Sequence, residues 1–504
     1  MKPNRTRCAL LAAAFVALAG CARDVTAPAA TPRTPSYSAA DVVDGQYLVL
    51  FKGNGIPADF QAQAEAAGGT VTFAHAETGF AVVGGLDAAG AATIGALSSV
   101  AQVEADAAFS IDVPQAAVEA DAAFPIDAPQ AAVEDGAGEA AGSVVQSVAN
   151  PAAAVLYSWQ WNMHLIHADA AWAAGKLGSP DVTVAILDTG LDYNNQDLNG
   201  QVDLSRSTSF VAADNALRAT YFPNRHPVTD FNGHGTNVAT QVSSRGIVFA
   251  GVTSRTRLIG VKVLDRKGQG TVGAFMAGVV WAADHGANVA NMSLGSGFSK
   301  VAAGPLLSFI NHAFNYANRQ GMLIVVSAGN GANDLDHDGN FYKSFCNAVH
   351  VVCVSAVGPE VASANPDNVA SYTSFGRSAI TVAAPGGNND FANGYPISLW
   401  PWGYDDASKV WSLCSRNQLD GLTQTGVPIL TACVLGGRLT GGMGTSQAAP
   451  HVSGLAALLM AEHGTGNVGF IKSRIASSAA DLGQPGVDPF YGHGRIDVAR
   501  ALGL

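Results

Sequence analysis

The stretch VTVAILD, from Val182 to Asp188, decides the fold of this chain. It is apolar almost throughout and lacks the polar alternation of a half-exposed strand, which is typical of a parallel strand buried on both faces. Helical patterns, such as Ala274 to His285 and Leu306 to Gln320, separate further runs of this kind. These runs are LIGVKVLD (Leu258 to Asp265), ANVANMSL (Ala287 to Leu294), MLIVVSAGN (Met322 to Asn330) and HVVCVSAV (His350 to Val357). The alternation predicts the α/β class, with a doubly wound parallel sheet in residues 154–504 that binds ligands at the carboxyl ends of its strands.

Length and composition narrow the possible functions. The 504 residues are enough for two or more domains and a large core. Hydrophobic residues make up 48% and charged residues 13%, as in a globular rather than a disordered protein. The formal net charge of -12 disfavours nucleic acid as a partner, because nucleic-acid binding needs a basic face.

Residues 1–21 have the features of a signal peptide. A basic start with Lys2, Arg5 and Arg7 precedes an apolar run from Cys8 to Ala19, which is too short to span a bilayer as a mature helix. The segment ends in LAGC, Leu18 to Cys21, which resembles the lipid-attachment box of bacterial lipoproteins. The alternative is an ordinary secretory signal. Either way we expect export from a bacterial cell, to the outside or, with lipid on that cysteine, to an anchored position on the cell envelope.

A small domain is predicted between two flexible segments. Residues 22–43 are rich in Ala, Pro, Thr and Ser and are typical of a tether. Residues 44–112 follow the order β-α-β-β-α-β, the split βαβ pattern of a small α+β, ferredoxin-like domain. Residues 113–153 are typical of an exposed, protease-sensitive linker. A tandem repeat begins at the end of the small domain and continues into the linker. DAAFSIDVPQAAVEA (Asp106 to Ala120) is followed by DAAFPIDAPQAAVED (Asp121 to Asp135), and two copies are too few for a solenoid.

Three motifs carry candidate catalytic residues at strand ends or helix starts. Asp188 follows an apolar run in AILDTGLD, His234 lies between glycines in NGHGTNVA, and Ser446 opens a helical stretch in GTSQAAP. Each alone has an ordinary explanation as a turn, loop or helix-cap residue. A serine nucleophile, however, needs a histidine as its base, and the imidazolium needs a carboxylate. Together, in the chain order Asp, His, Ser, the motifs resemble the subtilisin-like serine proteases, the subtilases.

The resemblance covers roughly residues 159–504 and the small domain, and it implies further roles. Asn330, which ends a strand in VVSAGNGAN, resembles the family's oxyanion asparagine. The family's primary specificity pocket would lie between two short segments. Its walls would be Ser293, Leu294 and Gly295 on one side and Ala328 and Gly329 on the other. Such small walls, without an evident acidic group, favour a broad or apolar side-chain preference.

The chain departs from the family pattern at several places. Gln447 stands where methionine is usual, and Asn237 stands where histidine is usual; neither belongs to the triad. Residues 387–440 form an insert with many aromatic residues. It either borders the cleft and reshapes specificity or decorates the surface, and the sequence leaves both open.

Four cysteines follow Cys21, an even number in an exported protein, so we expect disulfides. Three pairings are possible. We prefer the nearest-neighbour one, Cys346 with Cys353 and Cys414 with Cys433, and assign none of the four a catalytic role.

The segment DLDHDGN, Asp334 to Asn340, has the acidic spacing of a calcium loop, but Phe345 at position twelve excludes a true EF-hand. A looser structural calcium site and a solvated acidic loop are the two interpretations. The ligands of the former would be Asp334, Asp336 and Asp338. No cofactor is expected for the chemistry itself.

The resemblance implies an exported, monomeric serine endopeptidase that acts on protein or peptide substrates through an acyl-enzyme. It would be made as a self-processing zymogen, with residues 44–112 as the propeptide that assists folding and inhibits its own enzyme. Two alternatives differ in class. One is a catalytically inactive binding or scaffold protein on the same fold, and the other is an esterase that uses the same triad.

Overall fold

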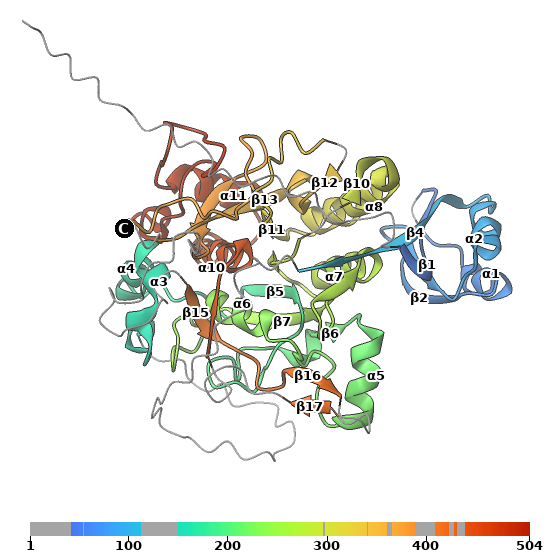
Figure 1. Cartoon of the computed structure of the whole chain (residues 1–504), viewed down its shortest axis with the longest axis horizontal. Coiled ribbons are helices and arrows are strands. Elements are labelled where there is room, and N and C mark those ends of the chain that lie inside the picture. Colours follow the sequence, from blue (N-terminus) through green and yellow to red (C-terminus); the bar gives the residue numbers. More distant parts are fainter. Residues whose placement is uncertain are drawn as a thin grey trace, which may run out of the picture.

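The computed structural model describes residues 42–53, 55–111, 150–295, 298–339, 341–359, 365–388, 409–422, 428–430 and 439–504. The predicted signal segment, most of the repeat linker and Cys433 lie outside these ranges. Two units are seen, an N-terminal unit (residues 42–111) and a larger unit (residues 150–504), which stand side by side (Figure 1). The exact domain boundaries given above stay predictions.

The N-terminal unit is an antiparallel sheet with two helices, in the predicted element order. Its elements are β1 (Val42–Phe51), α1 (Phe60–Ala66), β2 (Thr70–His75), β3 (Phe80–Gly84), α2 (Ala88–Gly95) and β4 (Val100–Ser110). The sheet order β2-β3-β1-β4 places the first strand beside the last, as a split βαβ unit requires. Val49, Phe60 and Ile94 are buried between sheet and helices, so the unit has a core of its own.

The larger unit is built on a parallel sheet of seven strands, which confirms the predicted fold class. The sheet order is β14-β13-β11-β9-β5-β7-β6, and each adjacent pair is parallel. The strands are β5 (Thr183–Asp188), β6 (Thr208–Ser209), β7 (Arg257–Lys262), β9 (Val289–Met292), β11 (Leu323–Ser327), β13 (Val351–Val357) and β14 (Val382–Pro385). From β5 the chain first completes one side of the sheet, with β6 at its edge and β7 between β6 and β5, and then, from β9, the other side. The order therefore reverses between β5 and β9, where such sheets bind ligands.

Helices cover both faces of this sheet, which explains why the strand sequences lack polar alternation. On one face Val184 and Ile186 of β5 pack with the helices α6 (His234–Val242) and α10 (Thr445–His463). On the other face Ala185 and Leu187 pack with α7 (Val272–Asp284) and α8 (Lys300–Arg319), the helices nearest the N-terminal unit (Figure 1). The other helices are α3 (Trp161–Leu165), α4 (Ala168–Ala173), α5 (Ala212–Tyr221), α11 (Val468–Ser478) and α12 (Val498–Leu502).

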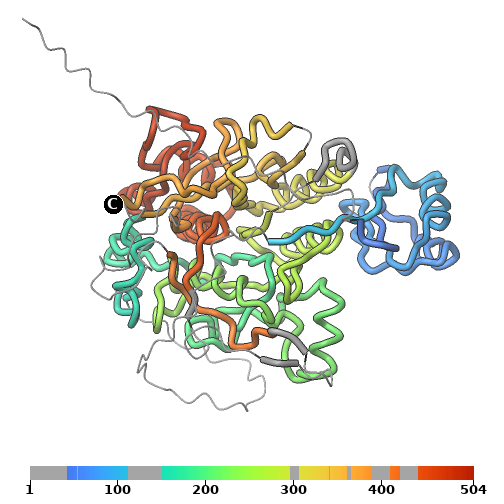
Figure 2. The backbone as a smooth tube through the Cα atoms, in the orientation of Figure 1, coloured from blue at the N-terminus to red at the C-terminus, as the bar shows by residue number. Residues whose placement is uncertain are grey.

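Short strands complete the structure. β8 (Gln269–Thr271) pairs with β4 and so joins the two units, as the blue trace reaching into the larger unit shows (Figure 2). The others form small antiparallel pairs: β10 (Phe298–Ser299) with β12 (Phe341–Tyr342), β15 (Val410–Leu413) with β18 (Leu439–Gly442), and β16 (Leu419–Leu422) with β17 (Pro428–Leu430). Within the described ranges, no helix is both long and apolar enough to cross a membrane.

Candidate active site

The Asp188 carboxylate and the His234 imidazole are in direct contact. Asp188 is the last residue of β5, and His234 is the first residue of α6. The distance from His234 Nδ1 to Asp188 Oδ1 is 2.8 Å, and the two side chains are 14% and 1% exposed. The buried carboxylate therefore fixes the ring through Nδ1 and leaves Nε2 on the side away from the carboxylate.

The surroundings of His234 also set its charge. Burial lowers the pKa of the imidazole, but the charge of Asp188, its hydrogen bond to the ring and the charge of Asp230 together raise it by more. The net pKa of His234 therefore lies above its ordinary value of 6.5. The ring is then a stronger base than a free histidine near neutral pH.

The turn before His234 is held by Asp230, a buried carboxylate that sequence reasoning missed. Its Oδ1 accepts from the N–H groups of Asn232 at 3.0 Å and Gly233 at 2.9 Å. Its Oδ2 accepts from the N–H and the hydroxyl of Thr236, at 3.0 and 2.6 Å. Gly233 has a φ of 109°, which favours glycine. The only sequence signal for this network was the turn composition of DFNGHG.

Ser446 lies in the first turn of α10 and is linked to the segment that follows β9. Its hydroxyl donates to the Ser293 carbonyl at 3.2 Å, and the Ser293 hydroxyl donates to the Ser446 carbonyl at 2.7 Å. Among the contacts of the described residues, the Ser446 hydroxyl thus bonds to this carbonyl rather than to His234. Catalytic hydrogen bonds often form only once substrate is bound.

The helices that carry His234 and Ser446 meet at their first turns. Gln447 Nε2 donates to Asn237 Oδ1 at 3.4 Å. Gln447 is the residue after Ser446, and Asn237 lies about one helical turn after His234. These are the two positions at which the sequence departs from the family pattern. The departures therefore contact each other, and the contact brings the two helix starts together.

Asn330 is bound to the residue before Ser446. Its Oδ1 accepts from the Thr445 N–H at 2.8 Å and from the Thr445 hydroxyl at 2.9 Å. Because the amide is planar, this turns its NH2 group to the other side, near Gly444. A Cβ at Gly444 would lie 3.3 Å from Asn330 Nδ2, so a residue without a side chain suits this approach.

The two predicted pocket walls lie next to each other. The Ser327 hydroxyl, at the end of β11, donates to the Leu294 carbonyl at 3.1 Å. The Gly329 N–H donates to the Thr445 hydroxyl at 3.0 Å. The structure thus brings the segments Ser293–Gly295 and Ala328–Gly329 together beside the start of α10.

The described part of the 387–440 insert supports the histidine turn. The Ser415 hydroxyl donates to the Asp230 carbonyl at 2.5 Å, and the Leu419 N–H donates to the Phe231 carbonyl at 2.9 Å. Arg416 holds Asp192 through two guanidinium contacts of 2.8 and 2.9 Å. Of the two interpretations above, these contacts favour an insert that borders the site over surface decoration, and its effect on specificity stays a prediction.

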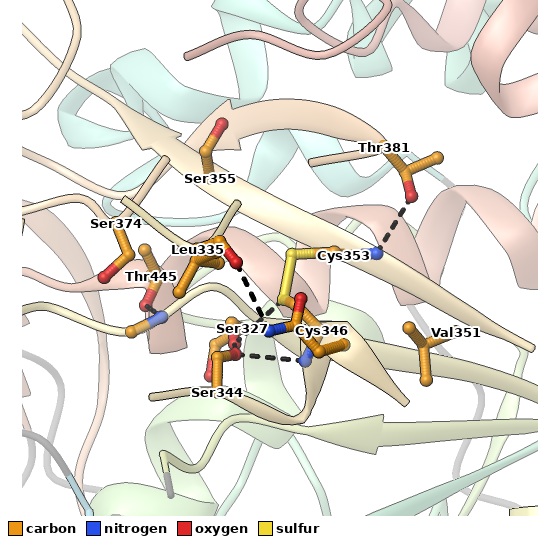
Figure 3. The surroundings of a disulfide bond; sticks show 12 residues. Ser327, Leu335, Ser344, Cys346, Val351, Cys353, Ser355, Ser374, Thr381 and Thr445 are labelled. Carbon is orange, nitrogen blue, oxygen red and sulfur yellow. Dashed lines mark hydrogen bonds between the residues drawn. A yellow bond between two sulfur atoms is a disulfide. The ribbon is translucent and has the colours of Figure 1, made fainter. Parts of the chain in front are cut away.

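One of the two expected disulfides is present among the described residues. Cys346 and Cys353 are bonded, with their Cα atoms 5.1 Å apart (Figure 3). The bond fastens the turn at Phe345–Asn347 to β13. Cys414 is also disulfide-bonded, but Cys433 lies outside the described residues, so that pairing stays a prediction.

The acidic loop does not form a set of metal ligands in this structure. Each of its three carboxylates has a different protein partner. The contacts are Asp334 Oδ2 with His337 Nδ1 at 2.9 Å, Asp336 Oδ1 with Ser378 Oγ at 2.6 Å, and Asp338 Oδ2 with Asn347 Nδ2 at 3.3 Å. Nowhere in the described ranges do three or more His, Cys, Asp or Glu side chains gather as a metal site would need. The residues present therefore do not fit a calcium ion without rearrangement.

Known proteins are similar to this chain in sequence. The family model of the subtilase family, Peptidase S8, matches residues 179–494. Subtilisin DY of Bacillus licheniformis is 28% identical over 345 residues, which are 68% of this chain and 97% of the relative. A thermophilic serine proteinase of Bacillus sp. strain AK1 is 28% identical over 347 residues, 68% of this chain and 67% of the relative.

Solved structures agree in fold. The epidermin leader peptide processing serine protease of Staphylococcus aureus superposes with a TM-score of 0.66 at 21% identity, over 91% of this chain and 97% of its own. A lanthipeptide protease gives a TM-score of 0.54 at 26% identity, over 69% of this chain and 95% of its own. Fold, site and relatives together define a subtilisin-like serine endopeptidase. The chain belongs to the subtilase family.

Proposed function

We propose that the protein is an exported endopeptidase, made as a self-processing zymogen, in which Asp188, His234 and Ser446 act as the catalytic triad. Ser446 attacks the substrate carbonyl, the C–N bond breaks, and the C-terminal fragment leaves as an amine that takes its proton from His234. Water then hydrolyses the acyl-enzyme that remains on Ser446. The observation that carries the proposal is the 2.8 Å contact between His234 and Asp188, next to the helix that carries Ser446 in its first turn. The reaction uses side chains and backbone groups alone, so we expect no cofactor in the chemistry.

Each residue of the triad has a role that follows from its contacts. His234 takes the hydroxyl proton of Ser446 on Nε2, because Nδ1 is bound to Asp188. Asp188 holds the ring and stabilises the imidazolium, which it can do strongly because it is buried. The N–H of Ser446 at the start of α10 and the NH2 of Asn330 are the candidate donors to the oxyanion.

Replacing Asn330 with alanine tests the oxyanion role. We expect kcat to fall by about 10²- to 10³-fold, the size known for this kind of substitution in subtilisin, with a smaller change in KM. The physical reason is that the donor binds the charge that develops only in the transition state. As a control, Asn467→Ala removes the cap of α11, whose Oδ1 accepts from the Phe470 N–H at 2.9 Å, and should leave kcat unchanged. Equal losses in both variants would contradict the role.

The pH dependence tests the base. Because the pKa of His234 is raised and only the neutral ring can accept a proton, kcat/KM should fall as the pH drops through a value above 6.5. It should stay high on the alkaline side of that value. The measurement is kcat/KM of one uncharged peptide between about pH 5 and pH 9. A flat profile would count against His234 as the base, and a midpoint below 6.5 would contradict the raised pKa.

The zymogen proposal is supported by the pairing of β4 with β8. The N-terminal unit packs on α7 and α8 through aromatic rings, with Phe80 against Phe309 at 6.0 Å and Phe109 against Phe275 at 6.0 Å. Asp106, which is fully buried, accepts from the Gly273 N–H at 2.9 Å, near the start of α7. A unit that caps a helix and fills an apolar surface of its enzyme is suited to assist folding and to block the cleft.

Export rests on the sequence of residues 1–21, with its basic start, apolar run and LAGC end. Lipid on Cys21 would anchor the precursor, and after self-cleavage its N-terminal segment, to the cell envelope; without lipid the precursor would be released. Mass spectrometry of the mature N-terminal segment separates the two, because an acylated cysteine adds the mass of its lipid.

Digestion of casein by the processed enzyme tests the function as a whole. Hydrolysis of casein supports an endopeptidase. Hydrolysis of a small ester without casein cleavage would support the esterase alternative. If the processed and folded protein hydrolyses neither casein nor the ester, the result supports the scaffold alternative.

A further inference from the structure

We propose that Lys343 determines specificity, and that it selects an acidic side chain, Asp or Glu, immediately before the scissile bond. The inference deepens the proposed function and rests on it, since it concerns what the same cleft accepts. It replaces the expectation of a broad or apolar preference, which came from the small residues of the pocket walls.

Lys343 lies on a segment that backs the specificity pocket. The next residue, Ser344, donates from its hydroxyl to the Ser327 carbonyl at 3.2 Å, and the Cys346 sulfur lies 3.7 Å from the same oxygen (Figure 3). The Ser327 hydroxyl donates to the Leu294 carbonyl at 3.1 Å. Ser327 therefore joins the two pocket walls to the segment that carries Lys343, and the neighbouring disulfide fixes that segment.

The Lys343 ammonium is half-buried and bound to a neutral group. Its nitrogen donates to the Asn333 amide oxygen at 2.8 Å, just past Asn330 in the sequence. No carboxylate of the described residues forms an ion pair with it, in contrast to the buried Lys262, which pairs with Asp214 at 2.9 Å. A partly desolvated cation with only a neutral partner is stabilised by an incoming carboxylate.

Strand β4 provides an extended peptide that is paired with the larger unit. It runs antiparallel to β8, with Phe109 opposite Gly270. Beyond the strand, the Ile111 N–H donates to the Gly268 carbonyl at 2.8 Å. An extended chain paired along the edge of a cleft is how a protease holds a substrate backbone.

The direction of this strand points to the triad. Just before β8 in the sequence, the Arg266 carbonyl accepts from Asn232 Nδ2 at 3.1 Å. The same side chain, through Oδ1, accepts from the His234 N–H at 3.1 Å. Because β4 runs antiparallel to β8, it runs toward the Arg266 and His234 end of this segment as it reaches Ile111. The next residue in the sequence is Asp112, so the inferred self-cleavage bond is the one that follows it.

The Phe109 side chain fills an apolar site next to the lysine segment. It is 4% exposed, and its ring centroid lies 6.0 Å from that of Phe275 and 6.1 Å from that of Phe345. Phe345 is two positions after Lys343 and stacks on Phe275 at 4.6 Å. One segment thus contacts the bound phenylalanine and carries the cation. This arrangement fits a substrate with Phe three residues before an acidic residue.

The tandem repeat carries the same pattern twice. FSID (Phe109 to Asp112) recurs as FPID (Phe124 to Asp127), with Pro125 in place of Ser110. In an antiparallel pair, alternate residues direct their N–H groups to the same neighbour. Since the Ile111 N–H is bonded to β8, that of Ser110 points away from it, and proline there removes no bond to β8. The second copy therefore offers a second processing bond, after Asp127.

Two peptide p-nitroanilides test the inference on the processed enzyme. One is Phe-Ser-Ile-Asp and the other is Phe-Ser-Ile-Phe, each with a blocked N-terminus. We expect the wild type to have the higher kcat/KM on the Asp peptide. The Lys343→Met variant should lower the Asp-to-Phe ratio of kcat/KM by about 10- to 100-fold, the factor for one charge-assisted hydrogen bond. As a matched control, Lys176→Met breaks a contact with Glu462 on the surface and should leave the ratio unchanged.

The outcomes separate this inference from the function on which it rests. If the wild type prefers the Phe peptide, or if Lys343→Met leaves the ratio unchanged, the inference is wrong while the endopeptidase stands. If neither these peptides nor casein is cleaved, the proposed function fails and takes the inference with it. N-terminal sequencing of the self-processed protein gives an independent readout. We expect a new N-terminus at Val113 or Ala128, and a cut after an apolar residue would overturn the inference.

Discussion

Replacing Ser446 with alanine is expected to reduce kcat on a peptide substrate by about 10⁶-fold, the size known for this substitution in subtilisin. The hydroxyl is the atom that forms the acyl-enzyme, and the neighbouring hydroxyl of Thr445 is already bound to Asn330 and Gly329. The precursor should also stay at full length, because it can no longer cut itself. Both results are read from intact mass and from progress curves.

The activity comparison needs processed protein, because an uncut precursor is inhibited whether or not its site works. The variant precursor can be cut in trans by tagged wild-type enzyme, which is then removed. A suitable control is Ser478→Ala, which removes a hydroxyl that donates to the Arg474 carbonyl at 2.7 Å in α11. It should process itself and keep full activity. A normally shortened Ser446→Ala protein, made in cells without wild-type enzyme, would show that another protease does the cutting.

Replacing Asp188 with asparagine is expected to reduce kcat by about 10⁴-fold near neutral pH, the size known for the carboxylate of such a triad. The substitution keeps the shape of the side chain but removes the negative charge 2.8 Å from His234 Nδ1. The imidazolium formed during the reaction then loses its stabilising partner. The pKa of His234 should also fall, because the charge of Asp188 helps to raise it.

The same strand offers a matched control for this charge change. Asp181 is exposed and precedes β5 at its amino end, whereas Asp188 ends β5 at its carboxyl end. Asp181→Asn should therefore leave kcat and the pH profile unchanged. If Asp188→Asn retained more than about a tenth of wild-type kcat, the carboxylate would not be acting on the imidazolium as proposed.

The elements of the fold were predictable because they depend on local pattern. The run from Val182 to Asp188 became a central strand, and the split βαβ order of the N-terminal unit is confirmed. Helix starts were less accurate. The helix predicted at Ala274 begins at Val272, where the Thr271 hydroxyl caps it, and the helix predicted at Leu306 begins at Lys300.

The supports of the site depend on contacts between residues far apart in the chain, so a local pattern could not reveal them. Asp230 accepts hydrogen bonds from the Thr236 hydroxyl on its carboxylate and from the Ser415 hydroxyl on its carbonyl. Only the folded structure brings Ser415 to this position. The acidic spacing of the loop at Asp334 suggested calcium, but Asp336 is bound by Ser378, which is distant in sequence. Lys343 had no motif around it, and its place beside Ser327 comes from the packing of Ser344.

The central claim is that Ser446 is a nucleophile activated by His234 and Asp188. Labelling of the processed enzyme with a fluorophosphonate, followed by peptide mapping, tests it most directly. The account predicts one label, on Ser446, and slow or absent labelling in Asp188→Asn. Wild-type protein that is folded and processed but carries no label on Ser446, or carries it on another serine, would contradict the account.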